Sequence, residues 1–338
     1  MRHTLLGSFG AAGCLLALAC TGVKGQQPAS TNAPSTATSQ SQPGTRLSVE
    51  QLEQQAFHLA AGRPLRPKAW PNSAKVAVAL SFDLDDETPS LRSGDLGSEP
   101  MTRGEYAAIQ GVPRILGVLA RQNVPASFYI PAVSAILHPQ LIKEIQESGK
   151  HEIGVHGWIH EDLPALNNEA EEQRLLNQAI DTLTKMTGRR PVGYRAPSWH
   201  FSQFTMKQIK AAGFLYDSSL MSSDDAYEIS VDGQPTGVIE LPIERIVDDS
   251  PYFGNNANGS LPAPELVERI FQSEFDVAYD EGGLYVLTMH PNYTGHRSRA
   301  AALEQLIVHM KSKAGVWFAT EEQIARYVKE ASARQTTH

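Results

Sequence analysis

The stretch Lys75-Val-Ala-Val-Ala-Leu-Ser-Phe82 runs directly into the acidic segment Asp83-Leu-Asp85-Asp-Glu87. The first part is a short, continuous apolar run, which is typical of a strand buried on both faces of a parallel sheet. The acidic segment is therefore expected at the carboxyl end of this strand. Alternate residues of a strand point the same way, so Asp83 and Asp85 are expected to face the same side.

The rest of the body alternates between strand-like and helix-like stretches. Strands are expected at 124–130, 152–155, 192–195, 237–243, 284–290 and 316–319, and helices at 105–122, 139–149, 169–187, 204–212, 263–281 and 300–314. This alternation predicts a parallel sheet. About seven such repeats in roughly 285 residues are typical of a β/α barrel. A doubly wound open sheet is the alternative, but no G-x-G-x-x-G follows the first strand.

Polar residues follow several of these expected strands. His156-Gly-Trp-Ile-His160, Arg195 and His290 each come directly after an apolar run, as the acidic segment does. In a β/α barrel the carboxyl ends of all strands meet on one face, where active sites are built. Two histidines four residues apart share a face if they lie on a helical turn, so both can reach one ion.

Asp85, His156 and His160 together form a plausible two-histidine, one-carboxylate metal set. Such a set leaves coordination positions open for water, which a hydrolytic metal site needs. Each residue also has a structural interpretation: a turn, a surface pair or a satisfied core histidine. Their joint occurrence at strand ends favours a site.

The composition narrows the function classes. The chain has 338 residues, a formal net charge of −8 and 41% hydrophobic residues, which allows a substantial core. No basic run stands out, so no nucleic-acid partner is expected. The two cysteines, Cys14 and Cys20, lie near the N-terminus, so the folded body is expected to have no disulfide.

The N-terminal part predicts export. Residues 1–20 resemble a signal peptide, with an apolar stretch that ends at Ala17-Leu-Ala19, a small-x-small cleavage pattern. Because Cys20 follows, the segment also resembles a bacterial lipoprotein signal, which would tether the protein to a membrane through lipidated Cys20. An ordinary secretory signal is the alternative. Residues 21–47 are rich in Ser, Thr, Gln and Pro and are expected to be a disordered linker.

Motifs spread along the body resemble, in order, those of the polysaccharide deacetylase family (the NodB homology domain). They are Ser81-Phe-Asp83-Leu-Asp85, His156-Gly-Trp-Ile-His160, Arg195-Ala-Pro-Ser-Trp199, Asp217-Ser-Ser219 and Leu287-Thr-Met-His290-Pro291. The likeness covers about Lys75 to Trp317. Further details are similar to a branch that holds peptidoglycan-deacetylase-like proteins and cofactor-independent allantoinases: Arg103-Gly-Glu-Tyr106, Gly111-Val-Pro-Arg114, Glu240-Leu-Pro242 and Asp248-Asp249. The resemblance implies an α/β fold, an irregular (β/α) barrel of about seven strands in a single domain, here 48–332.

The resemblance also implies roles at matching positions. Asp83 would be the general base, Arg195 would orient it and tune its charge, and His290 would be the general acid. Three residues would hold a divalent metal ion, expected to be Zn²⁺: Asp85, His156 and His160. The common family pattern has adjacent aspartates followed by Gly, whereas Leu84 separates them here. Asp86 therefore stays open as an alternative ligand.

These roles predict a metal-dependent hydrolase of non-peptide C–N bonds that deacetylates an N-acetylated cell-envelope sugar or polysaccharide. A hydrolase of a small cyclic amide or imide, similar to the allantoinases, is one alternative. Allantoinase-like members lack a complete metal set, whereas this chain keeps all three residues. A non-catalytic glycan-binding barrel is another alternative. The polar segment 88–104 is interpreted as a lid or substrate loop, or else as a surface insertion.

Overall fold

The computed structural model describes residues 42–254 and 261–336. The expected signal peptide, Cys20 and most of the expected linker lie outside the described residues. In residues 42–47 the structure has one 3₁₀ turn, Pro43–Arg46. Ser48–His338 form a separate compact unit, which contains every other element described below. No helix among the described residues is both long and apolar enough to cross a membrane.

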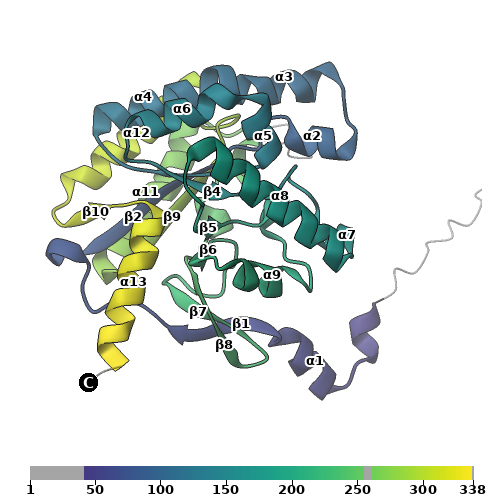
Figure 1. Ribbon diagram of the computed structural model, residues 1–338. Helices are drawn as coiled ribbons and strands as arrows, with labels where there is room; N and C mark the ends of the chain where they lie inside the picture. Colours follow the sequence, from purple (N-terminus) through teal and green to yellow (C-terminus); the bar gives the residue numbers. More distant parts are fainter. Residues whose placement is uncertain (1–41, 255–260, 337–338) are drawn as a thin grey trace, which may run out of the picture. The chain divides into compact units, whose positions relative to one another are not determined.

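A single mixed sheet organises this unit (Figure 1). Its order is β1-β7-β8-β6-β5-β4-β3-β2-β10, and β9 pairs with the other side of β2. The strands are β1 Leu59–Pro64, β2 Val76–Asp83, β3 Ser127–Ile130, β4 Glu152–Val155, β5 Gly193–Tyr194, β6 Tyr216–Asp217, β7 Tyr227–Val231, β8 Gln234–Glu240, β9 Leu284–Met289 and β10 Val316–Phe318. An isolated parallel bridge between Asp248 and Thr288 links β9 to the chain beyond β8. The sheet is therefore a curled, irregular barrel.

The sheet has ten strands in the described part of the chain, whereas about seven were expected. The difference comes mainly from β1 and β7, which pair antiparallel and lie outside the β/α repeat. Asp232 and Gly233 join β7 to β8 with φ angles of 49° and 73°. Two left-handed residues are what a tight type I′ hairpin needs. The remaining strands pair in parallel, as the alternation predicted.

Helices cover the outside of the sheet, with α4, α6 and α12 grouped along one side of it in Figure 1. They are α1 Val49–Ala56, α2 Thr88–Ser93, α3 Ser98–Tyr106, α4 Val112–Gln122, α5 Ala132–Leu137, α6 Pro139–Glu147, α7 Leu163–Leu166, α8 Glu169–Thr187, α9 Thr205–Ala212, α10 Ser250–Phe253, α11 Pro264–Glu281, α12 Arg297–Ser312 and α13 Glu321–Thr336. A π-helical turn, Ala107–Gly111, joins α3 to α4. The single helix expected at 105–122 is therefore longer and interrupted.

Strand β2 shows how the sequence separates two sides of the sheet. Its large residues, Val76, Val78, Leu80 and Phe82, belong to the core beneath the helices. Its small residues Ala77 and Ala79 belong to a second apolar cluster together with Ile324 and Val328 of α13. Because side chains alternate along a strand, Asp83 lies on the same side as the two alanines. This residue is 1% exposed, so the sequence places a carboxylate inside the barrel.

The segment 88–104, expected to be a loop, forms α2 and most of α3. Gly104 lies so close to β2 that a Cβ there would be 2.6 Å from the backbone carbonyl of Asp86. Gly111 and Gly295 both approach the carbonyl oxygen of Pro291, which follows His290, just as closely. The helix pair is thus fixed against the ends of both β2 and β9. Its role as a lid stays a prediction.

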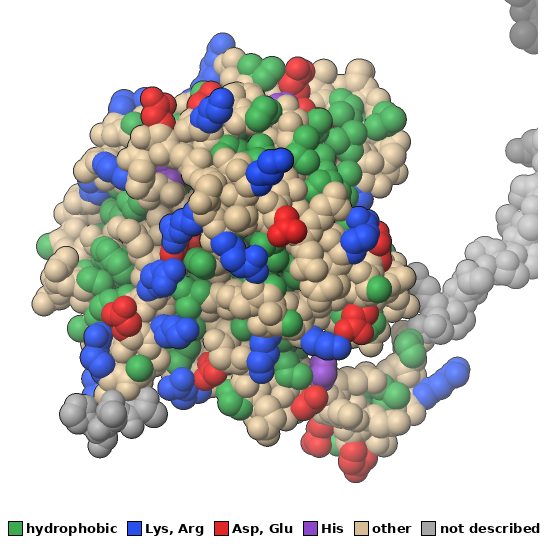
Figure 2. Space-filling view, in the orientation of Figure 1, with side chains coloured by type: hydrophobic (Ala, Val, Ile, Leu, Met, Phe, Trp, Pro, Cys, Tyr) green, Lys and Arg blue, Asp and Glu red, His purple; other side chains and the backbone are tan. Residues whose placement is uncertain are grey.

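The charged side chains of the surface differ from those of the interior. Figure 2 shows basic side chains spread over one face of the molecule among apolar and acidic ones. Inside the barrel, by contrast, Arg195 is 0% exposed and is the largest of the fully buried side chains. Burying a charge is costly unless the charge is paired and hydrogen-bonded. The groups around Arg195 must therefore pair with it, which points to a functional site in the barrel.

Candidate active site

Three expected ligands come together at the carboxyl ends of β2 and β4. Each of Asp85, His156 and His160 offers one ligand atom, and these atoms lie within 4.8 Å of one another. The Nε2 atom of His156 lies 3.4 Å from Asp85 Oδ1, and Nε2 of His160 lies 3.6 Å from Asp85 Oδ2. The two imidazole rings stand at 74° to each other. Both rings therefore present Nε2 to the same carboxylate.

The local backbone differs from the helical turn considered for the histidine pair. His156 follows β4 directly, and residues 157–159 form a turn. The carboxylate of Glu161 accepts the backbone N–H groups of Trp158 and Ile159, and His160 has a left-handed φ of 55°. Non-glycine residues seldom adopt this conformation, so the turn holds His160 in place at some conformational cost. Glu161 was not among the residues expected to form the site. The sequence indicates it only as a carboxylate next to the histidine pair.

The ligand atoms suit a divalent cation. His156 Nδ1 lies 2.8 Å from the carbonyl oxygen of Arg195, which can only accept, so Nδ1 carries the proton and Nε2 is free to bind. Burial lowers the pKa of His156, and lowers that of His160 to about 4, so both rings are neutral near pH 7. Among the described residues Asp85 Oδ1 is buried without a hydrogen-bond donor. Two neutral imidazoles and an unpartnered carboxylate oxygen fit a bound metal ion.

Asp83 lies beside this group, held by an ion pair. Its Oδ1 accepts a hydrogen bond of 2.8 Å from Arg195, and its Oδ2 lies 3.9 Å from His156 Nε2 and 4.0 Å from His290 Nε2. Burial favours the protonated acid, but the positive charges of Arg195 and His290 and the hydrogen bond from Arg195 outweigh it and lower the pKa of Asp83. Asp83 is therefore a carboxylate near neutral pH, with one oxygen turned toward the histidines.

His290 completes the cluster from the end of β9. Its Nδ1 lies 2.7 Å from Asp249 Oδ1, while its backbone N–H and the Thr294 hydroxyl both donate to Asp249 Oδ2. Burial opposes protonation of the ring, but the hydrogen bond and the negative charge of Asp249 raise the pKa of His290 well above its usual value. His290 is therefore a proton donor, with its Nε2 3.9 Å from Asp85 Oδ2. Asp249 was expected only as part of the Asp248-Asp249 motif, with no role of its own. This acidic pair after the strand expected at 237–243 is the feature of the sequence that points to it.

Asp86, the alternative ligand, belongs to another cluster. Its ligand atom groups with those of Glu87 and His138, and its Oδ2 is hydrogen-bonded to Ser134. His138 Nε2 lies 2.9 Å from Glu87 Oε2, and this hydrogen bond is the main cause of the raised pKa of His138. The geometry therefore separates Asp86 from the group that Asp85 forms with the histidine pair.

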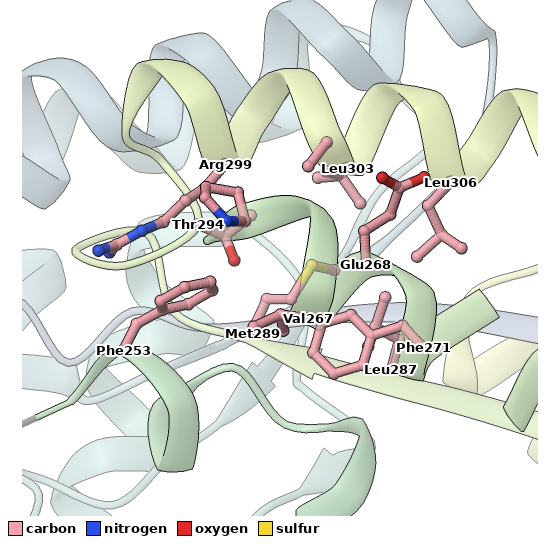
Figure 3. A pocket seen from close by; sticks show the side chains of 12 residues that line it. Phe253, Val267, Glu268, Phe271, Leu287, Met289, Thr294, Arg299, Leu303 and Leu306 are labelled. Atoms are coloured by element: carbon pink, nitrogen blue, oxygen red, sulfur yellow. The ribbon is translucent and has the colours of Figure 1, made fainter. Parts of the chain in front are cut away.

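An apolar pocket lies behind His290, between α11, α12 and β9. Figure 3 shows Phe271, Leu287, Met289 and Leu303 around it, with Arg299 near Phe253 at one end. The guanidinium of Arg299 lies 4.0 Å from the centre of the Phe253 ring. Thr294 lines this pocket and also donates to Asp249, so the packing of the pocket supports the partner of His290.

An ionised carboxylate, a protonated histidine and a group suited to a metal ion, all within about 4 Å of each other, define the acid–base site of a hydrolase. The family model for polysaccharide deacetylases matches residues 100–216. A solved structure described as a polysaccharide deacetylase from Mycobacterium smegmatis is 36% identical, with a TM-score of 0.73, and the match covers 80% of this chain and 95% of that one. The chain belongs to the polysaccharide deacetylase family.

Two further similarities refine this assignment. A peptidoglycan deacetylase of Helicobacter pylori is 27% identical over 281 residues, which are 74% of this chain and 95% of the relative. The crystal structure of Puue allantoinase is 26% identical, with a TM-score of 0.69, over 76% of this chain and 91% of that one. The family and the α/β barrel class predicted from the sequence are confirmed. So is the enzyme class, a hydrolase of amide C–N bonds, and the non-catalytic alternative is set aside.

Proposed function

We propose that this protein is a metal-dependent deacetylase that removes the acetyl group from an N-acetylated sugar or polysaccharide of the bacterial cell envelope. The supporting observation is the joint placement of Asp83, His290 and the group of Asp85 with the two histidines at one end of the barrel. The similarity to a peptidoglycan deacetylase over most of both chains supports an envelope glycan as the substrate class.

Asp85, His156 and His160 would hold the divalent ion, for which we propose Zn²⁺, since two imidazoles and one carboxylate suit that metal. When bound, the ion supplies positive charge that polarises the amide carbonyl and makes water more acidic. The backbone carbonyl of Arg195 fixes the His156 tautomer. Buried, neutral rings are ready to bind without first losing a proton.

Asp83 and His290 divide the proton transfers between them. Asp83 Oδ2 accepts a proton from the water that attacks the amide carbon, while Oδ1 stays bonded to Arg195. His290 Nε2 donates a proton to the departing nitrogen as the C–N bond breaks, and Asp249 stabilises the charged ring before that transfer. A new C–O bond replaces the C–N bond, so the products are acetate and a free amine.

Hydrolysis of a small cyclic amide is the second candidate, favoured by the similarity to an allantoinase over a comparable share of the chain. Both reactions break an amide C–N bond, so the same proton donors and acceptors would serve either. They differ in the substrate that must reach Asp83, and in whether acetate leaves.

Metal analysis and two assays on the purified protein test the proposal. We expect about one divalent ion per chain. We also expect acetate release from penta-N-acetylchitopentaose or peptidoglycan, and loss of this activity in Asp85→Ala. Ring opening of allantoin without acetate release would establish the second candidate. Acetate release that is unchanged in Asp85→Ala and after removal of metal would contradict the metal-dependent mechanism.

We further propose export to the cell envelope by a signal peptide at 1–20, a linker at 21–47 and a catalytic domain at 48–332, with lipid on Cys20. The lipid would hold the enzyme at the membrane, and the linker would let the domain reach a polymer nearby. Incorporation of labelled palmitate that is lost in Cys20→Ala supports the tether. A released protein that begins after residue 19 without lipid indicates the ordinary secretory signal.

A further inference from the structure

A chain of buried polar side chains runs through the barrel beneath Asp83. Arg195 joins Asp83 to Glu321, Glu321 accepts the Tyr129 hydroxyl at 2.7 Å, and Tyr129 is hydrogen-bonded to Tyr216 at 2.8 Å. Tyr216 in turn donates to Glu152 at 2.7 Å. Among these groups only Asp83 lies against the metal-ligand group. Apolar side chains could have filled this part of the barrel instead, so the presence of the remaining buried polar side chains needs an explanation.

Every N–H group of the Arg195 guanidinium has an acceptor. Nε donates to the carbonyl of Ser218, one terminal nitrogen donates to Ser81 Oγ and Asp83 Oδ1, and the other donates to Ser218 Oγ and to Glu321 Oε1 at 3.2 Å. The guanidinium also lies over the ring of Tyr129, 4.1 Å from its centre. Five donors in a rigid plane have one orientation that satisfies them all. The direction of the bond to Asp83 depends on the other four.

Glu321 is itself fixed in place. It is 0% exposed at the start of α13, two residues after Ala319, whose N–H donates to the carbonyl of Val78 in β2. Its backbone N–H donates to Ser127 Oγ in β3. The carboxylate therefore reaches Arg195 from a helix anchored to two strands of the same sheet, one of which carries Asp83.

We propose that Glu321 is a positioning residue for the deacetylation: it holds the Arg195 guanidinium so that one N–H faces Asp83 and the general base keeps its orientation. This inference rests on the proposed function. Glu321 touches neither the reacting atoms nor the metal-ligand group, and it acts through Arg195. It comes from the last helix of the chain, beyond the residues 100–216 that the family model matches.

Glu152 provides a matched control inside the same barrel. It is also buried, at 6% exposure, and its carboxylate accepts hydrogen bonds from Ser127, Tyr216 and the backbone of Glu322. It has no contact with Arg195 among the described residues. We expect replacement of Glu152 to disturb the same polar chain, but Glu152 makes none of the five Arg195 hydrogen bonds.

The test compares Glu321→Met with Glu152→Met, using acetate release from penta-N-acetylchitopentaose at a temperature where both variants are folded. We expect kcat of Glu321→Met to fall on the order of 10- to 100-fold with little change in KM, because misplacing a catalytic group by a fraction of a bond length has effects of this size. Glu152→Met should keep kcat within about 3-fold, since Glu152 makes no hydrogen bond to Arg195. Glu321→Gln should recover most of the activity, because its carbonyl can still accept from Arg195.

An unchanged kcat in Glu321→Met, or an equal loss in Glu152→Met, would overturn the inference. If Glu321→Met does not fold, Glu321→Asp serves instead, because it keeps the charge but cannot reach Arg195, and it should lose kcat in the same way. A chain that releases no acetate contradicts the proposed function rather than this inference. In that case crystal structures of the wild type and Glu321→Asp decide: a 2.8 Å contact between Arg195 and Asp83 that persists in the variant would refute the positioning role.

Discussion

Two clusters of acidic residues and histidines use neighbouring carboxylates of the segment after β2. The first consists of Asp85, His156 and His160, and the second of Asp86, Glu87 and His138. They differ in how the negative charge of the carboxylates is balanced. In the first, Asp85 faces His156 and His160, whose pKa values are lowered, and one Asp85 oxygen has no donor among the described residues. In the second, Glu87 is hydrogen-bonded to His138, whose pKa is raised. The hydrogen bond with Glu87 thus favours the protonated form of His138, a positive charge that the protein itself supplies.

The comparison shows which property distinguishes a cluster suited to a bound cation from one that is balanced internally. Both have three candidate ligands within the same distance of one another, so proximity alone does not separate them. The protonation state and the hydrogen bonds of the histidines do. A neutral ring with one nitrogen bound to a carbonyl offers a lone pair to an external cation, whereas a protonated ring offers only a donor. The neutral rings of the first cluster are suited to an external cation, whereas the second cluster contains a hydrogen-bonded pair of Glu87 and His138.

The largest expected effect comes from Asp85→Asn, which removes the charge that the first cluster presents to a cation. Metal affinity should fall by more than the roughly 10- to 100-fold that changes around metal ligands cost, and acetate release should fall with it. Metal content after dialysis and kcat measure the two effects. Full retention of one ion per chain would mean that the first cluster does not need its carboxylate.

Next comes Asp249→Asn, which leaves the first cluster untouched but removes the negative partner of His290. The ring would lose the charge that keeps it protonated, so kcat should fall by about 100-fold, in the range of general acid catalysis. Bound metal should remain at the wild-type level. Loss of metal together with activity would show that the histidine of β9 belongs to the first cluster after all.

A smaller effect is expected for His138→Ala, which breaks the ion pair of the second cluster. Stability should fall by about 1 to 2 kcal/mol, the cost of a partly buried hydrogen bond to a charged group, as measured by urea unfolding. Metal content and kcat should stay close to those of the wild type. If His138→Ala instead lost metal, the two clusters would have to be treated as one.

The last prediction depends on pH and concerns a third way of balancing buried carboxyl groups. The buried carboxyl groups of Asp217 and Glu240 lie opposite each other at the ends of β6 and β8, and Asp217 Oδ2 and Glu240 Oε2 have no hydrogen-bond donor among the described residues. We expect the two carboxyl groups to share a proton. Burial raises the pKa of Asp217 to about 6, and that of Glu240 well above its usual range. A raised pKa in the folded state means that the stabilisation is complete below the unfolded pKa, near 4, and is lost as the pH rises through about 6 and beyond.

Glu240→Gln would replace the shared proton by a permanent amide donor, while its carbonyl keeps the N–H groups of Ser219 and Leu220. We expect the variant to be more stable than the wild type at pH 8 by about 1 to 3 kcal/mol, with the advantage shrinking toward pH 4. Thermal unfolding across this pH range measures it. An advantage of equal size at every pH would show that no shared proton is involved.

The sequence predicted what depends on short-range pattern. Three features could be predicted because each depends on residues close together in the sequence. They are the apolar run of β2, the polar residues after β4 and β9, and the alternation of strands and helices. Three things were not accessible. The tautomer of His156 depends on a carbonyl 39 residues away, the turn at Glu161 depends on side-chain hydrogen bonds, and Glu321 meets Arg195 only because α13 returns to the barrel. The first and the last are set by contacts between segments far apart in the chain. The turn is local, but it depends on which backbone N–H groups the Glu161 carboxylate meets.

The glycines that hold α3 and the π-helical turn against the ends of β2 and β9 have a consequence for sequence tolerance. Gly104 touches the backbone beside Asp86, and Gly111 and Gly295 touch the carbonyl beside His290. A methyl group at any of them would clash with backbone atoms next to one of these strand ends, so the local backbone would have to move. The surroundings of the proposed base and acid therefore depend on residues that take no part in proton transfer. Random mutagenesis should therefore recover substitutions at these glycines as proteins that fold but are inactive, although glycine has no side chain that could take part in the reaction.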